Sequence, residues 1–409
     1  MSEQIQPPKG VPLFNPWSPE FIANPYPSYR LLRETEPMHY MPLGFYLASR
    51  HADVTKDLRD KRFGKDFIGR MTRRAGPQIL DEPVYRSKSH WMLQLDPPDH
   101  ERLRGLVVRA FSARRIEDMR PRIQAIVDDI IDRIEPRGHM DLIAEFAYRL
   151  PVTVICDMLG IPEEDREFIY TSSRMGGRLL DLAPLSPAEI QQQNAFNLKM
   201  ADYFQRLFEL RRRQPADDLT THLVQAEEAG DKLTNEELTA NVILLFGAGH
   251  ETTVNLIGNG LLALHRNPDQ LGMLRNDPSL AANAVEELLR YDSSVQVTGR
   301  TTLGDVDEIG GIPLAKGQSV LCLLGSANRD PAVYADPDKF DIQRTDIRPL
   351  SFGGGIHYCV GAQLARLEGE IAINTLLHRL PNLRIDDIDH PDWRQTFVLR
   401  GLNKLPASW

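Results

Sequence analysis

The sequence predicts a mainly α-helical protein with small β-sheets, of the α+β class, and three observations support this. Helical patterns dominate from Pro98 to about Leu380. The clearest of them opens at a capping box, Thr234-Asn235-Glu236-Glu237, and continues to Asn267-Pro268. Strand-like runs are short and cluster late in the chain. No linker, low-complexity stretch or internal repeat divides the chain, so we expect a single domain over residues 1–409.

Taken in order, residues 1–95 mix short helical patterns with strand-like pieces such as 45–47. The helix-rich body covers about 98–290 and 360–380, and the β-richer parts cover about 38–60, 295–325 and 383–409. The long helix after Thr234 has roughly 30 residues and a length of about 45 Å. Strands are expected at 295–303 and 318–324, with a terminal pair at 397–399 and 402–405.

Composition excludes several classes of protein. The 409 residues are 42% hydrophobic and 26% charged, which is typical of a globular protein. The net charge of −9 argues against a general binder of nucleic acid or anionic membranes. No secretory signal is visible in residues 1–8, and no apolar run reaches the ~18–20 residues that span a bilayer. Three separated cysteines, Cys156, Cys322 and Cys359, fit a reducing compartment, so we expect a cytoplasmic protein.

Cys359 lies in a glycine-rich loop, residues 352–361, just before a helical pattern. Glycines allow positive φ and a close approach of main chain to a bound group. The helix start that follows places unpaired N–H groups and a positive dipole end near the sulfur. Both features favour thiolate over thiol. Cysteine is also one of the residue types most often buried without any function, so the loop alone does not establish a site.

The spacing Phe-x-x-Gly-x-x-x-Cys-x-Gly is complete at Phe352, Gly355, Cys359 and Gly361. It resembles the haem-binding loop of the cytochromes P-450, and the chain resembles the soluble bacterial members of that family. The resemblance implies the cytochrome P-450 fold, with haem b (iron protoporphyrin IX) between a long distal helix and the helix after the cysteine loop. It also implies that Cys359 is the ligand of the haem iron.

The long helix carries Ala-Gly-His-Glu-Thr-Thr at 248–253, where Gly247 and Gly249 each cost up to about 1 kcal/mol relative to alanine. A flexible buried helix with a polar patch is the plain interpretation. The run also resembles the oxygen-activating motif of the cytochromes P-450. That resemblance implies that Glu251 and Thr252 relay protons to bound dioxygen.

Glu287 and Arg290 are three residues apart on one helical face, and such pairs are usually solvated and weak. In this order along the chain they resemble the Glu-x-x-Arg pair of the family, which binds an arginine in the loop before the haem cysteine. Arg344 supplies that partner. The resemblance implies that the three residues are structural and hold the loop that presents Cys359.

Haem carries two propionates, which need charge-assisted hydrogen bonds when they are buried. Four cationic candidates lie at positions that match the family. His100 and Arg104 are four residues apart on one helical face, Arg300 follows a strand-like run, and His357 precedes Cys359 by two residues. The resemblance implies that all four bind the propionates.

The residues that resemble the family's substrate-contacting regions are mostly apolar, although ordinary core packing is an alternative for each. They predict a lipophilic small-molecule substrate with one or two polar handles, and they are Leu244, Leu245, Ala248, Val295, Val297, Phe397 and Val398.

Seven arginines lie between Arg102 and Arg122, against the two acids Glu117 and Asp118. An arginine-rich helix is often only a solvated surface. In a member of this family it is also a surface on which an acidic ferredoxin could dock, because complementary charge raises association rates. No flavin or iron–sulfur domain is appended to the chain, so electrons are expected from a separate ferredoxin and ferredoxin reductase.

The sequence therefore predicts a monomeric haem-thiolate monooxygenase that inserts one atom of dioxygen into a lipophilic substrate, by hydroxylation or a related oxidation. One alternative is a peroxide-driven haem-thiolate enzyme, although such enzymes generally lack the acid and alcohol pair present at 251–252. Another is a thiolate-haem sensor or carrier without turnover, which has no need of a proton relay.

Overall fold

The computed structural model describes residues 14–173, 185–228 and 233–409. The expectation that residues 1–8 carry no secretory signal therefore concerns residues outside these ranges. In the described part of the chain, no helix combines the length and apolar composition needed to cross a membrane.

Helices dominate, as the sequence predicts, and the expected class of mainly α with small β-sheets is confirmed. The longer helices are α8 (Arg120–Ile134), α9 (Arg149–Leu159), α11 (Pro187–Arg213), α13 (Asn235–Arg266), α15 (Ala281–Tyr291) and α17 (Ala362–Arg379). The shorter ones are α1 (Pro19–Ala23), α2 (Tyr26–Thr35), α3 (His51–Arg59), α4 (Phe67–Ala75), α5 (Pro83–Ser89), α6 (Asp99–Val108), α7 (Ala113–Asp118), α10 (Arg166–Ser173), α12 (Leu219–Glu228), α14 (Pro268–Asn276) and α16 (Leu324–Ala327).

Single helical turns join many of these elements. They are η1 (Pro77–Asp81), η2 (Met92–Gln94), η3 (Arg109–Phe111), η4 (Glu135–Arg137), η5 (Ile143–Ala147), η6 (Glu163–Asp165), η8 (Pro278–Leu280), η9 (Leu350–Phe352) and η10 (Gly355–His357). The η5 turn has π-helical geometry.

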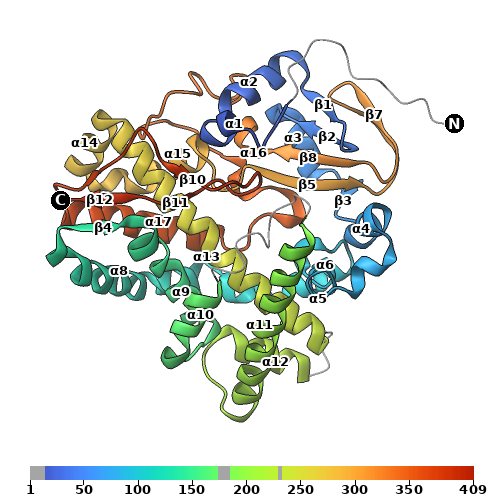
Figure 1. The fold of residues 1–409 in the computed structure, drawn as a ribbon, viewed down its shortest axis with the longest axis horizontal. Coiled ribbons are helices and arrows are strands. Elements are labelled where there is room, and N and C mark those ends of the chain that lie inside the picture. The colour runs from blue at the N-terminus through green and yellow to red at the C-terminus, as the bar shows by residue number, and fades with distance from the viewer. Residues whose placement is uncertain (1–13, 174–184, 229–232) are drawn as a thin grey trace.

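The expected long helix is α13, which has 32 residues and a length of about 48 Å. The predicted capping box is present: the Thr234 hydroxyl accepts from the Glu237 N–H at 3.2 Å, and the Glu237 carboxylate accepts from the Thr234 N–H at 2.9 Å. The helix runs through the middle of the molecule and packs against α9, α11, α15 and α17 (Figure 1). Its residues are therefore buried on nearly all sides, which suits its apolar composition.

Helix α8 shows the simpler amphipathic pattern. Its buried residues follow the spacing of a single helical face, which packs toward α9 and α17, and they are Ile123, Ile126, Val127, Ile130, Ile131 and Ile134. These helices and α13 share the largest apolar core of the described residues.

The strands form small sheets beside this helical body. The main sheet has the order β1-β2-β8-β5-β3, with β2 and β8 parallel and the other pairs antiparallel. The strands of the chain are β1 (Met38–Met41), β2 (Phe45–Ala48), β3 (Phe63–Gly64), β4 (His139–Asp141), β5 (Val297–Thr302), β6 (Val306–Ile309), β7 (Ile312–Leu314), β8 (Ser319–Leu323), β9 (Arg384–Ile385), β10 (Asp392–Trp393), β11 (Leu402–Lys404) and β12 (Pro406–Ser408). In Figure 1 the main sheet lies beside α2, α3 and α16, away from α8 and α14.

The expected terminal pair of strands is wrong in its pairing. Strand β11 pairs with β10, whereas Leu399 forms an isolated bridge with Val295. The reason is Arg400, whose side chain donates to Asp292 and to the carbonyls of Ile22 and Ala23 at the end of α1. This anchorage turns the chain between the two runs and separates them.

Candidate functional site

A cavity lies between α6, α13, β5 and the loop that carries Cys359. Its volume is about 280 Å³, whereas about 10–15 Å³ on the same measure holds one water molecule. The cavity therefore has room for a ligand much larger than water. The predicted site residues that line it are His100, Arg104, Leu244, Leu245, Ala248, Thr252, Val295, Val297, Arg300, His357, Cys359 and Val398.

Two residues that the sequence assigns to catalysis or substrate contact do not line this cavity. Phe397 packs instead in an aromatic cluster with Phe14 and Phe21, so its expected place in a substrate pocket is wrong. Successive side chains of an extended segment point to opposite sides, and here it is Val398 that faces the cavity. Glu251 also lies away from the cavity and forms an ion pair with Arg394.

Cys359 is held by the glycine-rich loop that the sequence singled out. Its N–H donates to the Phe352 carbonyl at 3.0 Å, just before α17 begins. Gly353 and Gly355 have φ of 69° and 67°, and a Cβ on Gly355 would lie 2.1 Å from the Leu58 carbonyl oxygen. The loop therefore requires glycine at residue 355, both for conformation and for space.

The Cys359 side chain is exposed, yet it lines the cavity. Burial raises the pKa of its thiol, while the Gly361 N–H and the Arg104 and Arg366 guanidinium groups act in the opposite direction. Its exposed surface thus faces the cavity. The Gly361 N–H at the start of α17 acts in the direction that the sequence predicts, and burial acts against it, so the thiolate stays a prediction.

Thr252 places its hydroxyl beside the cavity on α13. The hydroxyl donates to the Ala248 carbonyl one turn earlier at 3.1 Å, which is the back-bonding expected of threonine inside a helix. Gly249 also lines the cavity, and a Cβ there would lie 3.2 Å from the Ile155 side chain. Close packing between α13 and α9 thus offsets the helix penalty of Gly249.

Glu251 is part-buried, and burial raises the pKa of its carboxyl while the Arg394 guanidinium lowers it. Arg394 also donates to the Leu402 carbonyl at 3.2 Å. The structure therefore brings Thr252 to the cavity and holds its neighbour Glu251 on the C-terminal segment.

His100, Arg104, Arg300 and His357 converge at one side of the cavity, together with Lys65, which sequence reasoning missed. The rings of His100 and His357 are 4.2 Å apart between centroids. Arg104 donates to the Tyr358 carbonyl at 2.6 Å, and Lys65 and Arg300 both donate to the Gly299 carbonyl, at 3.1 and 3.0 Å.

None of these three cations forms an ion pair with another described residue. Burial lowers the pKa of Lys65 and of Arg300, and burial together with Arg104 lowers the pKa of His100 to about 4.

Two buried nitrogens in this group, His100 Nδ1 and His357 Nε2, have no hydrogen-bond partner. Buried polar atoms are nearly always satisfied, and buried cations normally have an anionic partner. An anion with several acceptor oxygens would satisfy both requirements at once. The two carboxylates of a haem fit this set of donors.

Glu368 on α17 lines the same cavity and was also missed. Its Oε2 has no hydrogen-bond partner among the described residues, and burial raises the pKa of its carboxyl well above the ordinary value. Neither Lys65 nor Glu368 stands in a pattern that distinguishes it from surface residues. Lys65 directly follows strand β3, and Glu368 lies in the second turn of α17 after the cysteine loop. These positions are the only features of the sequence that could have indicated the two residues.

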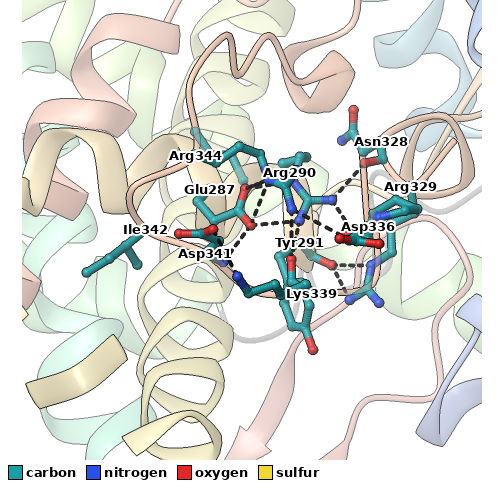
Figure 2. A network of polar contacts seen from close by, with 12 residues as sticks. Glu287, Arg290, Tyr291, Asn328, Arg329, Asp336, Lys339, Asp341, Ile342 and Arg344 are labelled. Carbon is teal, nitrogen blue, oxygen red and sulfur yellow. Dashed lines mark hydrogen bonds and ion pairs between the residues drawn. The ribbon is translucent and has the colours of Figure 1, made fainter. Parts of the chain in front are cut away.

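Glu287, Arg290 and Arg344 lie together on the other side of α15, as Figure 2 shows. Arg290 donates from Nε and from an outer guanidinium nitrogen to the two oxygens of Glu287, at 2.6 and 2.7 Å, and both side chains are 0% exposed. Arg344 Nε lies 3.4 Å from Glu287 Oε2. The three residues form one buried network around a single carboxylate.

Asn328 joins this network to the cysteine loop. Its carbonyl accepts from Arg290 at 3.1 Å, and its side chain accepts from the Leu350 N–H and donates to the Ser351 hydroxyl. Residues 350–352 are the η9 turn, and the Phe352 carbonyl accepts from the Cys359 N–H. A continuous chain of hydrogen bonds therefore runs from Glu287 to Cys359.

Comparisons with known proteins agree with this geometry. The family model described as Cytochrome P450 matches residues 61–400. Cytochrome P450 107B1 of Saccharopolyspora erythraea is 43% identical over 399 residues, covering 95% of each chain. Cytochrome P450 monooxygenase PikC of Streptomyces venezuelae is 41% identical over 401 residues, covering 95% of this chain and 92% of that protein. The crystal structure of CalO2 superposes with a TM-score of 0.90 at 37% identity, covering 98% of this chain and 99% of that one.

The match covers most of the chain and includes the cysteine loop, the distal helix and the buried ion-pair network. The fold is the cytochrome P450 fold, and membership implies a haem-thiolate cofactor. The chain belongs to the cytochrome P450 family and is an oxidoreductase of the monooxygenase type.

Proposed function

We propose that this protein inserts one atom of dioxygen into a lipophilic small organic molecule, with haem b as its cofactor. The observation that carries the proposal is the common cavity onto which Cys359, the cations at its side and Thr252 all open. A thiolate-ligated haem supplies the oxidising chemistry when it is bound. The protein supplies binding, orientation and protons.

Cofactor binding falls to residues of four separate elements. Cys359 provides the thiolate for the iron. His100 and Arg104 of α6, Arg300 of β5 and His357 bind the propionates, and Lys65 is added to this group. The unsatisfied nitrogens of His100 and His357 support this assignment, because they gain acceptors only from a ligand.

Proton supply falls to Thr252, whose hydroxyl is the polar group of α13 next to the apolar lining. To pass its proton into the cavity, the hydroxyl must release its bond to the Ala248 carbonyl and take a replacement proton from a neighbouring donor. Glu251 would donate the replacement proton to Thr252, and this requires its carboxyl group to leave Arg394 first. Breaking this ion pair is therefore a step that precedes proton transfer.

The absorption spectrum of the reduced, carbon-monoxide-bound protein tests the cofactor assignment. A strongly red-shifted band in the wild type that is lost in Cys359→Ala supports thiolate ligation by this residue. A wild-type spectrum without that band contradicts it. Turnover measurements with hydrogen peroxide in place of electron donor separate the monooxygenase from a peroxide-driven enzyme, since the former requires reducing equivalents.

The lipophilic character of the substrate follows from the cavity wall, to which Leu244, Leu245, Val295, Val297 and Val398 contribute. Burial of an apolar ligand against such a wall is favourable by about 25 cal/mol per Å². A panel of apolar compounds, titrated for the shift of the haem from low to high spin, identifies binders. Hydrophilic binders of equal affinity would contradict this part of the proposal.

We also propose that an acidic ferredoxin, reduced by a ferredoxin reductase, docks near Arg102–Arg122. Arg102, Arg120 and Arg122 are engaged in ion pairs with acids of this chain. Arg109 and Arg115 are exposed and form no ion pair with any residue that the structure describes. Arg114 is likewise exposed and forms no ion pair with a described residue, so these three arginines are the ones available to a partner.

Charge reversal tests the docking surface. Arg109→Glu and Arg115→Glu should slow reduction by ferredoxin, with a strong dependence on salt, because complementary charge steers association. Arg206→Glu, at an exposed side chain of α11, makes the same change in net charge elsewhere and should leave the rate unchanged. Equal rates in all variants would exclude this surface.

The remaining parts of the proposal concern the protein as a whole. We expect a cytoplasmic monomer folded as one domain, consistent with the net charge of −9 and with the continuous core around α13. Size-exclusion chromatography with light scattering gives the oligomeric state, and a mass other than that of one chain would overturn the expectation of a monomer.

A further inference from the structure

Arg70 is a cation of the cavity that the cofactor does not explain. It lies on α4 and lines the same cavity as Cys359, next to the apolar residues Met92 and Leu93. Among the described residues it forms one hydrogen bond, a long one, from an outer guanidinium nitrogen to Gln94 Oε1 at 3.4 Å. Its Nε is buried and has no hydrogen-bond partner in the same part of the chain.

The charges around Arg70 do not neutralise it. No carboxylate in the described ranges forms an ion pair with it, and the nearest acid, Asp66, is paired with Arg73 at 2.8 Å. Arg73 and Arg74 add further positive charge nearby. Arginine keeps its proton under all ordinary conditions, so a buried guanidinium with unused donors needs an anion.

The haem propionates already have their own donors. Lys65 is electrostatically close to His100, His357 and Arg300, so it belongs to the propionate group. The groups that act most strongly on Arg70 belong to α4 itself, and its hydrogen-bond partner belongs to the η2 turn. Arg70 reaches the cavity from a different element, α4, although it lies close enough to Lys65 to lower the pKa of that lysine. Its hydrogen-bond partner Gln94 is not shared with the propionate group.

We propose that Arg70 binds the carboxylate of an amphiphilic substrate whose apolar body lies against the leucines and valines of the cavity. The guanidinium offers its free Nε–H and an outer N–H to the two carboxylate oxygens, which is the two-pronged geometry that arginine favours. Gln94, which also lines the cavity, supplies an additional amide donor. This inference rests on the proposed function of the cavity and specifies its substrate class as lipophilic carboxylic acids.

The test compares three probes of equal chain length with the purified holoenzyme: dodecanoate, methyl dodecanoate and dodecan-1-ol, all below their micellar concentrations. Binding is measured by the spin-state shift of the haem and, independently, by equilibrium dialysis. Wild type should bind dodecanoate about tenfold or more tightly than the ester or alcohol, which is the size expected for hydrogen bonds to a charged group. Arg70→Gln should lose this preference while keeping its affinity for the alcohol.

Arg74→Gln is the matched control, because Arg74 lies one helical turn further along α4, is exposed and does not line the cavity. It makes the same change in net charge and should retain the preference. Equal affinity of the wild type for all three probes would overturn the inference. The inference would also be overturned if the Arg70→Gln variant lost haem but kept its preference for dodecanoate in equilibrium dialysis, because Arg70 would then bind the cofactor and not the substrate. The carbon-monoxide spectrum of each variant reports separately on the haem-thiolate assignment.

Discussion

Replacing Arg290 by alanine should destabilise the protein by about 3–5 kcal/mol, the range observed when one partner of a buried ion pair is removed. The side chain is 0% exposed. It donates two hydrogen bonds to Glu287 and further bonds to three backbone carbonyls, those of Asn328, Pro337 and Lys339. Alanine leaves all of these acceptors without their donor and leaves the Glu287 carboxylate buried.

Part of that loss is compensated, which places the expected value near the lower end, about 3 kcal/mol. Glu287 keeps the Asp341 N–H at 3.0 Å and Arg344 Nε at 3.4 Å. The double variant Glu287→Met/Arg290→Met removes both charges together. Its destabilisation should be smaller than the sum of the single variants by about 1 kcal/mol or more, because neither member of the fully buried pair is left without the other. Arg344 loses its contact with Glu287 but keeps its backbone acceptors.

Urea denaturation of the holoenzyme, followed by circular dichroism, measures the free energy of unfolding from the midpoint and slope of each curve. Arg133→Ala is the control, since Arg133 forms an ion pair with Asp129 on α8 and its side chain is 70% exposed. That variant should lose less than about 1 kcal/mol. If Arg290→Ala lowered the free energy of unfolding no more than Arg133→Ala does, burial of the ion pair would not increase its contribution to stability, and the prediction would be wrong.

Three further predictions concern residues of the cavity. Thr252→Ala should bind substrate as before while electrons go to hydrogen peroxide instead of product, measured as product formed per electron pair consumed; unchanged coupling would contradict the role of the hydroxyl. Lys65→Met should speed haem transfer to apomyoglobin by about tenfold, because a charge-assisted bond to a propionate is lost, whereas the exposed Lys61→Met should not. Burial raises the pKa of Glu368 above its value in the unfolded chain, so stability falls as pH rises above the unfolded pKa. Glu368→Gln should therefore lose less melting temperature between pH 5 and pH 8 than wild type, and equal losses in a calorimeter would refute this.

The parts of the fold that could be predicted from sequence are those with local signals. Helix α13 has a capping box, regular apolar spacing and a terminal Asn-Pro, and each of these acts within a few residues. The pairing of the last strands depends instead on Arg400, which binds Asp292 more than 100 positions earlier in the chain. No pattern within the terminal segment could have indicated that contact.

The same distinction applies to the site. Motifs located Cys359, Thr252 and the propionate group, because the spacing of residues along a loop or a helix turn fixes where their backbones lie. Side-chain direction is not fixed in this way. Glu251 follows the distant Arg394 away from the cavity, and Phe397 joins an aromatic cluster with Phe14. The sequence analysis assigned both residues to the cavity because of the motifs or segments that contain them. In the structure, partners far away in the chain fix where their side chains lie.

The balance of charge in the cavity explains why a cofactor alone does not complete it. Four basic side chains line the wall, Lys65, Arg70, Arg104 and Arg300. Glu368 is the only carboxyl group among the described residues that lines it, and it favours the neutral form because burial raises its pKa. Two propionates can neutralise two of these cations, and the Lys65, Arg104 and Arg300 group has the donors to bind them. A carboxylate at Arg70 would neutralise a further positive charge in a different part of the wall. A neutral lipophilic molecule would leave that guanidinium buried without an anion, and for this reason the charge of the substrate, more than its shape, should decide affinity at Arg70.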